Sequence, residues 1–185
     1  MPPGDNARVS WLRDQIRMAQ ELLEGTMAGV TPERAHWAPP GVASPIGANY
    51  AHIVFGQDGL VAGLLQAAAP LFAAAWAGRT GASELPPGPE AASPGFPDWS
   101  KWARRVRIDL VAFRPYAEAV YGATDRYLAS LDDAGLGRSV DVSALGLDRM
   151  TVGQLLNAGV LGNTLTHVGE ISCLKGLQGA KGYPF

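Results

Sequence analysis

The spacing of the apolar residues constrains the fold most strongly, because they recur every three or four positions in four separate stretches of the chain. The first stretch runs from Asn6 to about Met27. Its apolar positions are Val9, Leu12, Ile16, Ala19, Leu23 and Met27. This spacing places them along one face of a helix. No alternating strand pattern of comparable strength is present, so the chain has to bury helix faces against one another.

The second helix is predicted to begin with Ser44 as its cap and Pro45 in its first turn, and to run to about Ala68. Residues 31–45 contain several prolines and cannot form one long helix. A short helical piece is expected at 71–77, and the Gly- and Pro-rich segment that follows, to residue 97, is expected to be a long loop.

The third long helix follows a short one capped by Asp98 and extends to about Leu131. Pro115 interrupts its pattern, since proline in a helix interior removes a hydrogen bond. We expect either a kink there or a new helix that begins near Arg114.

Residues 132–150 are expected to be an irregular connection with a short strand-like piece. Thr151 then caps the last helix, which should end at Gly176 or Gly179. The chain is therefore predicted to be all-α: one domain over residues 1–185, an antiparallel four-helix bundle with long irregular connections.

Composition excludes several classes of protein. Fifteen basic against seventeen acidic residues leave a formal charge of −2, so no positive field attracts nucleic acid or anionic lipid. Cys173 is the single cysteine and cannot form an internal disulfide. The sequence shows no secretory signal pattern and no stretch long and apolar enough for a membrane span. We therefore expect a cytoplasmic protein with no membrane or nucleic-acid partner.

His52 lies early in the second helix, and Gly56, Gly59 and Gly63 follow it on the same face. Glycine in a helix interior costs about 1 kcal/mol relative to alanine, so three of them need a reason. One reason is close approach of a neighbouring helix. The other is space kept open beside the histidine.

The last helix carries a polar triplet at helical spacing, Asn163, His167 and Glu170, within an otherwise apolar stripe. Buried polar groups need a partner, so this face requires water, a metal or a mutual hydrogen-bond network, such as a pair between His167 and Glu170. If the second and last helices are neighbours, His52 and His167 can face each other. Two imidazoles plus a carboxylate or amide can hold a divalent transition metal.

Two other reactive residues are expected to be structural. His36 lies in a proline-flanked loop, where a packing role is the simpler interpretation. Cys173 is interpreted as a buried, inert thiol. The tyrosines of the third helix (Tyr116, Tyr121 and Tyr127) are expected in the core or in a pocket wall.

The segments NYAHIVFGQDGL, around His52, and NTLTHVGEISCLKGLQG, around His167, resemble the DinB-like superfamily, in layout over most of the chain. The resemblance implies a helical bundle with a zinc or nickel ion at one end. In that family the ion is held by a histidine of the second helix and by a pair spaced by four in the last helix. These positions fall on His52, Asn163 and His167.

The chain departs from this pattern at Asn163, where the family has histidine or glutamate. An amide is a weak ligand for such an ion, so metal affinity should fall unless Glu170 substitutes for it. The resemblance implies a metal-dependent enzyme of thiol-transfer or hydrolase type, acting on a small thiol or electrophile. The alternative is a non-catalytic bundle that binds a small molecule or acts as a dimeric assembly module. A homodimer is expected in either case.

Overall fold

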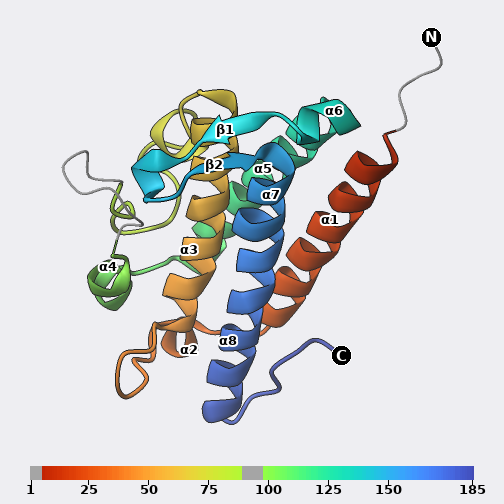
Figure 1. The fold of residues 1–185 in the computed structure, drawn as a ribbon. Helices are drawn as coiled ribbons and strands as arrows, with labels where there is room; N and C mark the ends of the chain where they lie inside the picture. The colour runs from red at the N-terminus through yellow and green to blue at the C-terminus, as the bar shows by residue number, and fades with distance from the viewer. Residues whose placement is uncertain (1–5, 89–97) are drawn as a thin grey trace.

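The computed structural model describes residues 6–88 and 98–185, and most of them are helical (Figure 1). Four long helices pack side by side: α1 (Ala7–Met27), α3 (Ile46–Asp58), α5 (Leu110–Ala129) and α8 (Asn163–Leu177). Both α1 and α3 pack against α5 and against α8. Each long helix therefore has two long neighbours, and the core lies between them.

Short elements connect and cover the long helices. They are α2 (Pro32–His36), the 3₁₀ turn η2 (Leu71–Ala73), α4 (Ser100–Arg105), α6 (Asp133–Leu136), β1 (Ser139–Asp141), the 3₁₀ turn η3 (Ser143–Leu145), β2 (Arg149–Thr151) and α7 (Val152–Leu155). Strands β1 and β2 form an antiparallel pair with Ser139 opposite Thr151. Figure 1 shows this pair across one end of the long helices, with α2 at the other end.

Two π-helical segments extend the long helices. Segment η1 (Gly59–Leu65) continues α3, and η4 (Leu156–Gly162) joins α7 to α8. They meet where Leu60 packs on Gly159: a Cβ on Gly159 would lie only 2.5 Å from Leu60 Cδ1. Such π segments shift the side-chain register and recur at functional sites. Here η4 ends directly before Asn163, so it sets the face on which the polar triplet of α8 lies.

The core confirms the helical periodicity. The predicted apolar positions of α1 are all buried. Near the middle, aromatic rings from two helices pack at an angle to each other: the Phe55 ring centroid lies 5.6 Å from that of Phe113 and 5.3 Å from that of Tyr116. Tyr116 and Tyr127 are buried, as expected. A mostly helical fold is therefore the observed class.

Helix ends test the capping predictions. Thr151 and Gln154 form a capping box at the start of α7, which confirms the predicted cap. The Ser44 prediction is wrong, because Pro45 is the N-cap residue of α3 and the helix begins at Ile46. Asp98 accepts a hydrogen bond from Ser100 N, but Trp99 takes the N-cap position of α4.

Pro115 lies inside α5, which begins at Leu110 with Asp109 as its cap. A new helix near Arg114 is therefore the wrong alternative. Asp109 explains the early start, because its carboxylate accepts from the amides of Val111 and Ala112. The predicted loop over 78–97 is irregular as far as residue 88, and its remainder lies outside the described residues.

A buried lysine joins the ends of two helices. Lys175 of α8 donates from Nζ to the carbonyl of Thr26 at 2.6 Å, at the C-terminal end of α1. Burial lowers the pKa of Lys175. A cation at this position satisfies carbonyls that have no partner within α1 and interacts favourably with the helix dipole. In residues 6–88 and 98–185, no helix combines the length and apolar character needed to cross a membrane.

Candidate functional site: a histidine pocket between α3 and α8

Packing of α3 against α8 brings two histidines together. The ring centroids of His52 and His167 lie 4.8 Å apart, with an angle of 77° between the planes. His52 also meets Trp99, just before α4, edge to face at 4.3 Å. The sequence expectation that these histidines face each other if the helices are neighbours is therefore met in this structure. Trp99 was not predicted, because nothing in its local pattern says where α4 will lie.

The histidines lie beside a cavity of about 180 Å³. Three elements contribute to its lining: α3 and the residues before it, α4 and the residues before it, and α8. Its polar side chains are Ser44, Asn49, His52, Ser100 and His167, and its apolar wall is made largely by Trp99 and Trp102. Most ligand sites are larger, so this cavity suits a small ligand.

His52 is held neutral. Its pKa is lowered to about 4, first because burial disfavours the charged ring and then because of the electrostatic interaction with His167. The Asn163 amide and the Glu170 carboxylate act in the opposite direction. A neutral imidazole is the form that binds metals or accepts a proton.

The Nδ1 atom of His52 is buried, and none of the described residues offers it a hydrogen bond of regular geometry. The Asn163 side chain nevertheless lies within hydrogen-bonding reach of this ring, and that interaction raises the pKa of His52. Buried polar atoms almost always have a partner, so an orphaned one calls for an explanation such as water, an ion or a ligand. This atom is the clearest sign that the pocket is incomplete as a purely structural element.

Glu170 holds the ring of His167. Its Oε2 lies 2.7 Å from Nδ1 of His167, one turn earlier on α8, and its side chain is 51% exposed. A carboxylate there accepts a hydrogen bond from Nδ1–H, which leaves Nε2 with its lone pair available. Carboxylates orient metal-binding histidines in the same way. Glu170 is therefore placed to support His167, which matches the predicted pairing of the two.

The four predicted site residues are thus close together, but they do not form a complete ligand set. No group of three His, Cys, Asp or Glu suited to a metal gathers anywhere in the described part of the chain. His36 lies elsewhere: its Nε2 accepts from the amide of Ile108, so it packs α2 against the segment before α5. Of the predicted ligands, the two imidazoles line the pocket, and the amide of Asn163 interacts with the His52 ring.

The glycines after His52 do not make the close helix contact. A Cβ on Gly56 or Gly59 would meet no described atom within 4 Å, and one on Gly63 would reach only Pro70. Space is therefore open beside Gly56 and Gly59, although neither lines the histidine pocket. The prediction of a buried Cys173 is wrong, since this residue is exposed on α8.

A profile of the DinB superfamily matches residues 15–171, a range that includes α3, η4 and both pocket histidines. The chain belongs to the DinB superfamily. It is also similar to a solved structure described as the conserved protein of locus from Enterococcus faecalis. That similarity has a TM-score of 0.73 and 18% sequence identity, and it covers 90% of this chain and 94% of the other. At this identity it shows the fold alone. No protein of curated function gives a significant match.

Proposed function

We propose that this chain is a divalent-metal-binding member of the DinB superfamily, in which His52 and His167 are the ligands of a zinc or nickel ion. The carrying observation is the pair of facing imidazoles, 4.8 Å between centroids, one of which has a buried and orphaned nitrogen. The proposal includes the antiparallel four-helix bundle expected from the sequence, because that arrangement places the second and last long helices side by side.

The donor chemistry fits such an ion as a two-imidazole site. His52 contributes a neutral ring at physiological pH, so no proton has to be displaced before it binds metal. Glu170 keeps the Nε2 of His167 available and makes that ring a better donor. Both histidines come from long helices rather than loops, which holds their relative placement.

Asn163 makes the site weak. Catalytic zinc sites usually have three protein ligands drawn from His, Cys, Asp and Glu. Here the third protein donor is an amide, one helical turn before His167. We infer an exchangeable ion with lower affinity than a three-ligand site would give.

A bound ion of this kind would supply Lewis acidity or lower the pKa of a coordinated thiol or water. The residues around it would choose the substrate. Trp99 and Trp102 offer an apolar wall, and Ser44, Asn49 and Ser100 offer hydrogen bonds. A cavity of about 180 Å³ suits a small thiol or a small electrophile. The reaction class in this proposal is thiol transfer or hydrolysis.

The test is metal binding by untagged protein purified without chelators. Elemental analysis and calorimetric titration with zinc and with nickel are run on the natural chain and on three variants. His167→Ala should abolish binding. Asn163→His supplies a third imidazole and should raise affinity at least about tenfold. Cys173→Ser is the matched control, because its exposed thiol is another potential zinc ligand, and it should bind as the natural chain does.

Two outcomes would contradict the proposal. One is the absence of metal from the natural chain together with no uptake on titration. The other is metal that survives His167→Ala but is lost in Cys173→Ser, because the ion would then sit on the exposed thiol.

A second function is favoured by the incomplete ligand set: a non-catalytic pocket that binds a small molecule without metal. In that case a ligand polar group, rather than an ion, would satisfy His52. Quenching of tryptophan fluorescence by a ligand in the presence of a chelator, lost in His52→Gln, would favour this function over the metal site. The homodimer stays a prediction, which sedimentation at tens of micromolar would test.

A further inference from the structure

A cavity of about 260 Å³, separate from the histidine pocket, lies between α1 and the C-terminal half of α5. Its floor includes the apolar side chains of Ile16 and Leu128, both of which belong to the core. Its polar residues are Arg13, Arg17 and Gln20 of α1 and Asp125 of α5. None of these residues lines the histidine pocket. We call this cavity the arginine groove.

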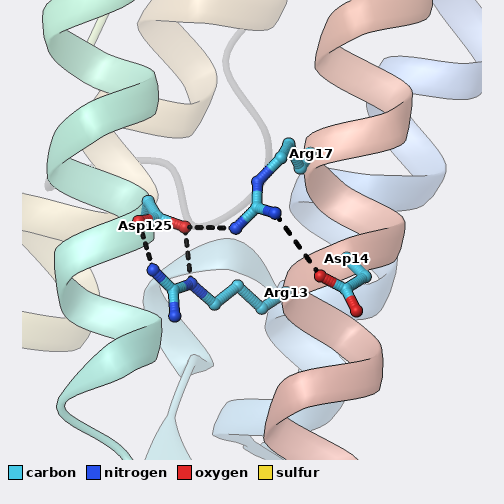
Figure 2. A network of polar contacts seen from close by, with 4 residues as sticks. All are labelled: Arg13, Asp14, Arg17 and Asp125. Carbon is cyan, nitrogen blue, oxygen red and sulfur yellow. Dashed lines mark hydrogen bonds and ion pairs between the residues drawn. The ribbon is translucent and has the colours of Figure 1, made fainter.

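Ion pairs order one side of the arginine groove (Figure 2). Arg13 donates from Nε and NH2 to the two carboxylate oxygens of Asp125, both at 2.6 Å. Two parallel bonds fix the plane of this guanidinium, so its remaining N–H groups have a set direction. Hydrogen bonding to Arg13 is also the largest cause that lowers the pKa of Asp125. Arg13 is therefore a positioned donor.

Arg17 is held more loosely. Its guanidinium lies 3.4 Å from Asp125 and 3.6 Å from Asp14, and about half of its side chain is exposed. Exposed pairs at such distances contribute little, so Arg17 can turn toward another acceptor at small cost. The two aspartates already balance the charges of Arg13 and Arg17. A singly charged ligand consequently suits the groove better than a phosphate.

The independent observation is Gln20. The residue is only 9% exposed and lines the groove, yet its Nε2 has no hydrogen-bond partner among the described residues. A buried amide donor without a partner carries its full desolvation cost. The last torsion of a glutamine is soft, so the amide can turn toward an acceptor in the groove. A ligand oxygen would satisfy it.

The other wall of the arginine groove is formed by Tyr121 and Gly122. Gly122 has no side chain there, and a Cβ on it would lie 3.3 Å from NH1 of Arg126, the flexible end of that residue. The ring of Tyr121 forms part of the lining, while its hydroxyl donates away to Glu24. The wall therefore presents an aromatic ring rather than a further acceptor, and the flexible end of Arg126 lies beside Gly122.

We propose that the arginine groove binds a small organic carboxylate, with the carboxylate on Arg17, Arg13 and Gln20 and its apolar body over Ile16, Leu128 and Tyr121. The three side chains each supply N–H donors, and the floor supplies apolar contact. This inference is independent of the metal site.

The test uses hexanoate as the carboxylate probe and 1-hexanol as its neutral counterpart, each titrated into the full ¹⁵N-labelled chain. Hexanoate should shift amide resonances of α1 and α5 around Gln20 and Gly122. Affinity should fall about tenfold in Arg17→Gln and in Gln20→Met, since each loses a hydrogen bond to a charged group. Hexanol should bind much more weakly.

Arg8→Gln is the matched control, because Arg8 is an exposed arginine of the same helix outside the groove. It should leave hexanoate binding unchanged, and so should His167→Ala in the other pocket. The proposal is overturned if hexanoate shifts no groove residue, if Arg17→Gln and Gln20→Met bind as Arg8→Gln does, or if hexanol binds equally well. Gln20→Met keeps the size of the side chain and removes the orphaned amide, so it should fold.

Discussion

Two of the polar side chains of helix α3, Asp58 and His52, differ in whether their hydrogen-bonding atoms have partners. Asp58, at its end, is buried, and its carboxylate accepts from the amides of Leu71 and Phe72, both at 3.0 Å. The hydroxyl of Tyr116 donates to the same carboxylate at 2.9 Å. His52, on the same helix, has a buried Nδ1 with no partner among the described residues.

This difference in hydrogen bonding indicates which of the two residues has a structural role and which is a candidate for binding. Three donors bind the carboxylate of Asp58, so the chain gains a fixed connection between α3, η2 and α5. His52 is also buried, but its Nδ1 has no hydrogen bond to offset the free-energy cost of desolvation. Groups left unsatisfied in this way are the ones to test for binding, whereas satisfied ones should be tested for stability.

The largest expected effect is on stability at the satisfied cluster. Asp58→Ala leaves two amides and a buried phenol without their acceptor and should lower the free energy of unfolding by about 3 kcal/mol or more. Tyr116→Phe removes one donor of three and should cost about 1 to 2 kcal/mol. Urea denaturation of both variants measures this. Equal losses in the two would mean that the cluster is not organised around Asp58.

The next effect is the pH dependence of stability due to His52. Its pKa is lowered to about 4 in the folded chain, while an unfolded histidine titrates near its ordinary value of 6.5. The unfolded chain therefore binds the proton more readily, and stability falls as the pH drops from about 6.5 to 4. The share due to His52 is about 2 to 3 kcal/mol.

Denaturation at pH 6.5 and at pH 4.5, compared between the natural chain and His52→Gln, isolates that share. The variant should lose less stability on acidification. If both lose the same amount, His52 is not buried in its neutral form. A direct NMR titration of the His52 ring should likewise show no protonation at pH 6.

The smallest effect is expected at the open pocket itself. His167→Ala should change the free energy of unfolding by less than about 1 kcal/mol, because His167 is partly exposed and its partner Glu170 is half exposed. Thermal denaturation without added metal checks this. A loss as large as that of Asp58→Ala would contradict the contrast, since His167 would then be part of the structural framework.

Much of the fold was predictable because helix periodicity is a local property. The apolar spacing from Val9 to Met27 predicts α1 almost to the residue, and Thr151 with Gln154 predicts the start of α7. The errors concern where helices begin, because neighbouring residues compete for the N-cap position. Pro45, rather than Ser44, is the N-cap residue of α3. Asp109 caps α5, so this helix begins before Pro115 and contains it.

The candidate site was predictable only in part. Spacing brought Asn163, His167 and Glu170 onto one face of the last helix, and the pair between His167 and Glu170 follows from it. The π segment before Asn163 and the position of Trp99 beside His52 have no comparable sequence signal. Both depend on how α7 and α4 pack against elements distant in the chain.

The sequence by itself determined the helices, their polar and apolar faces and the donors that each carries, because those depend on residues within a few turns of one another. Only the tertiary structure decided which donors are satisfied. Burial, charge and hydrogen bonding are properties of the packed environment, so Asp58 became part of the framework while His52 and Gln20 kept buried nitrogens without partners in the described structure.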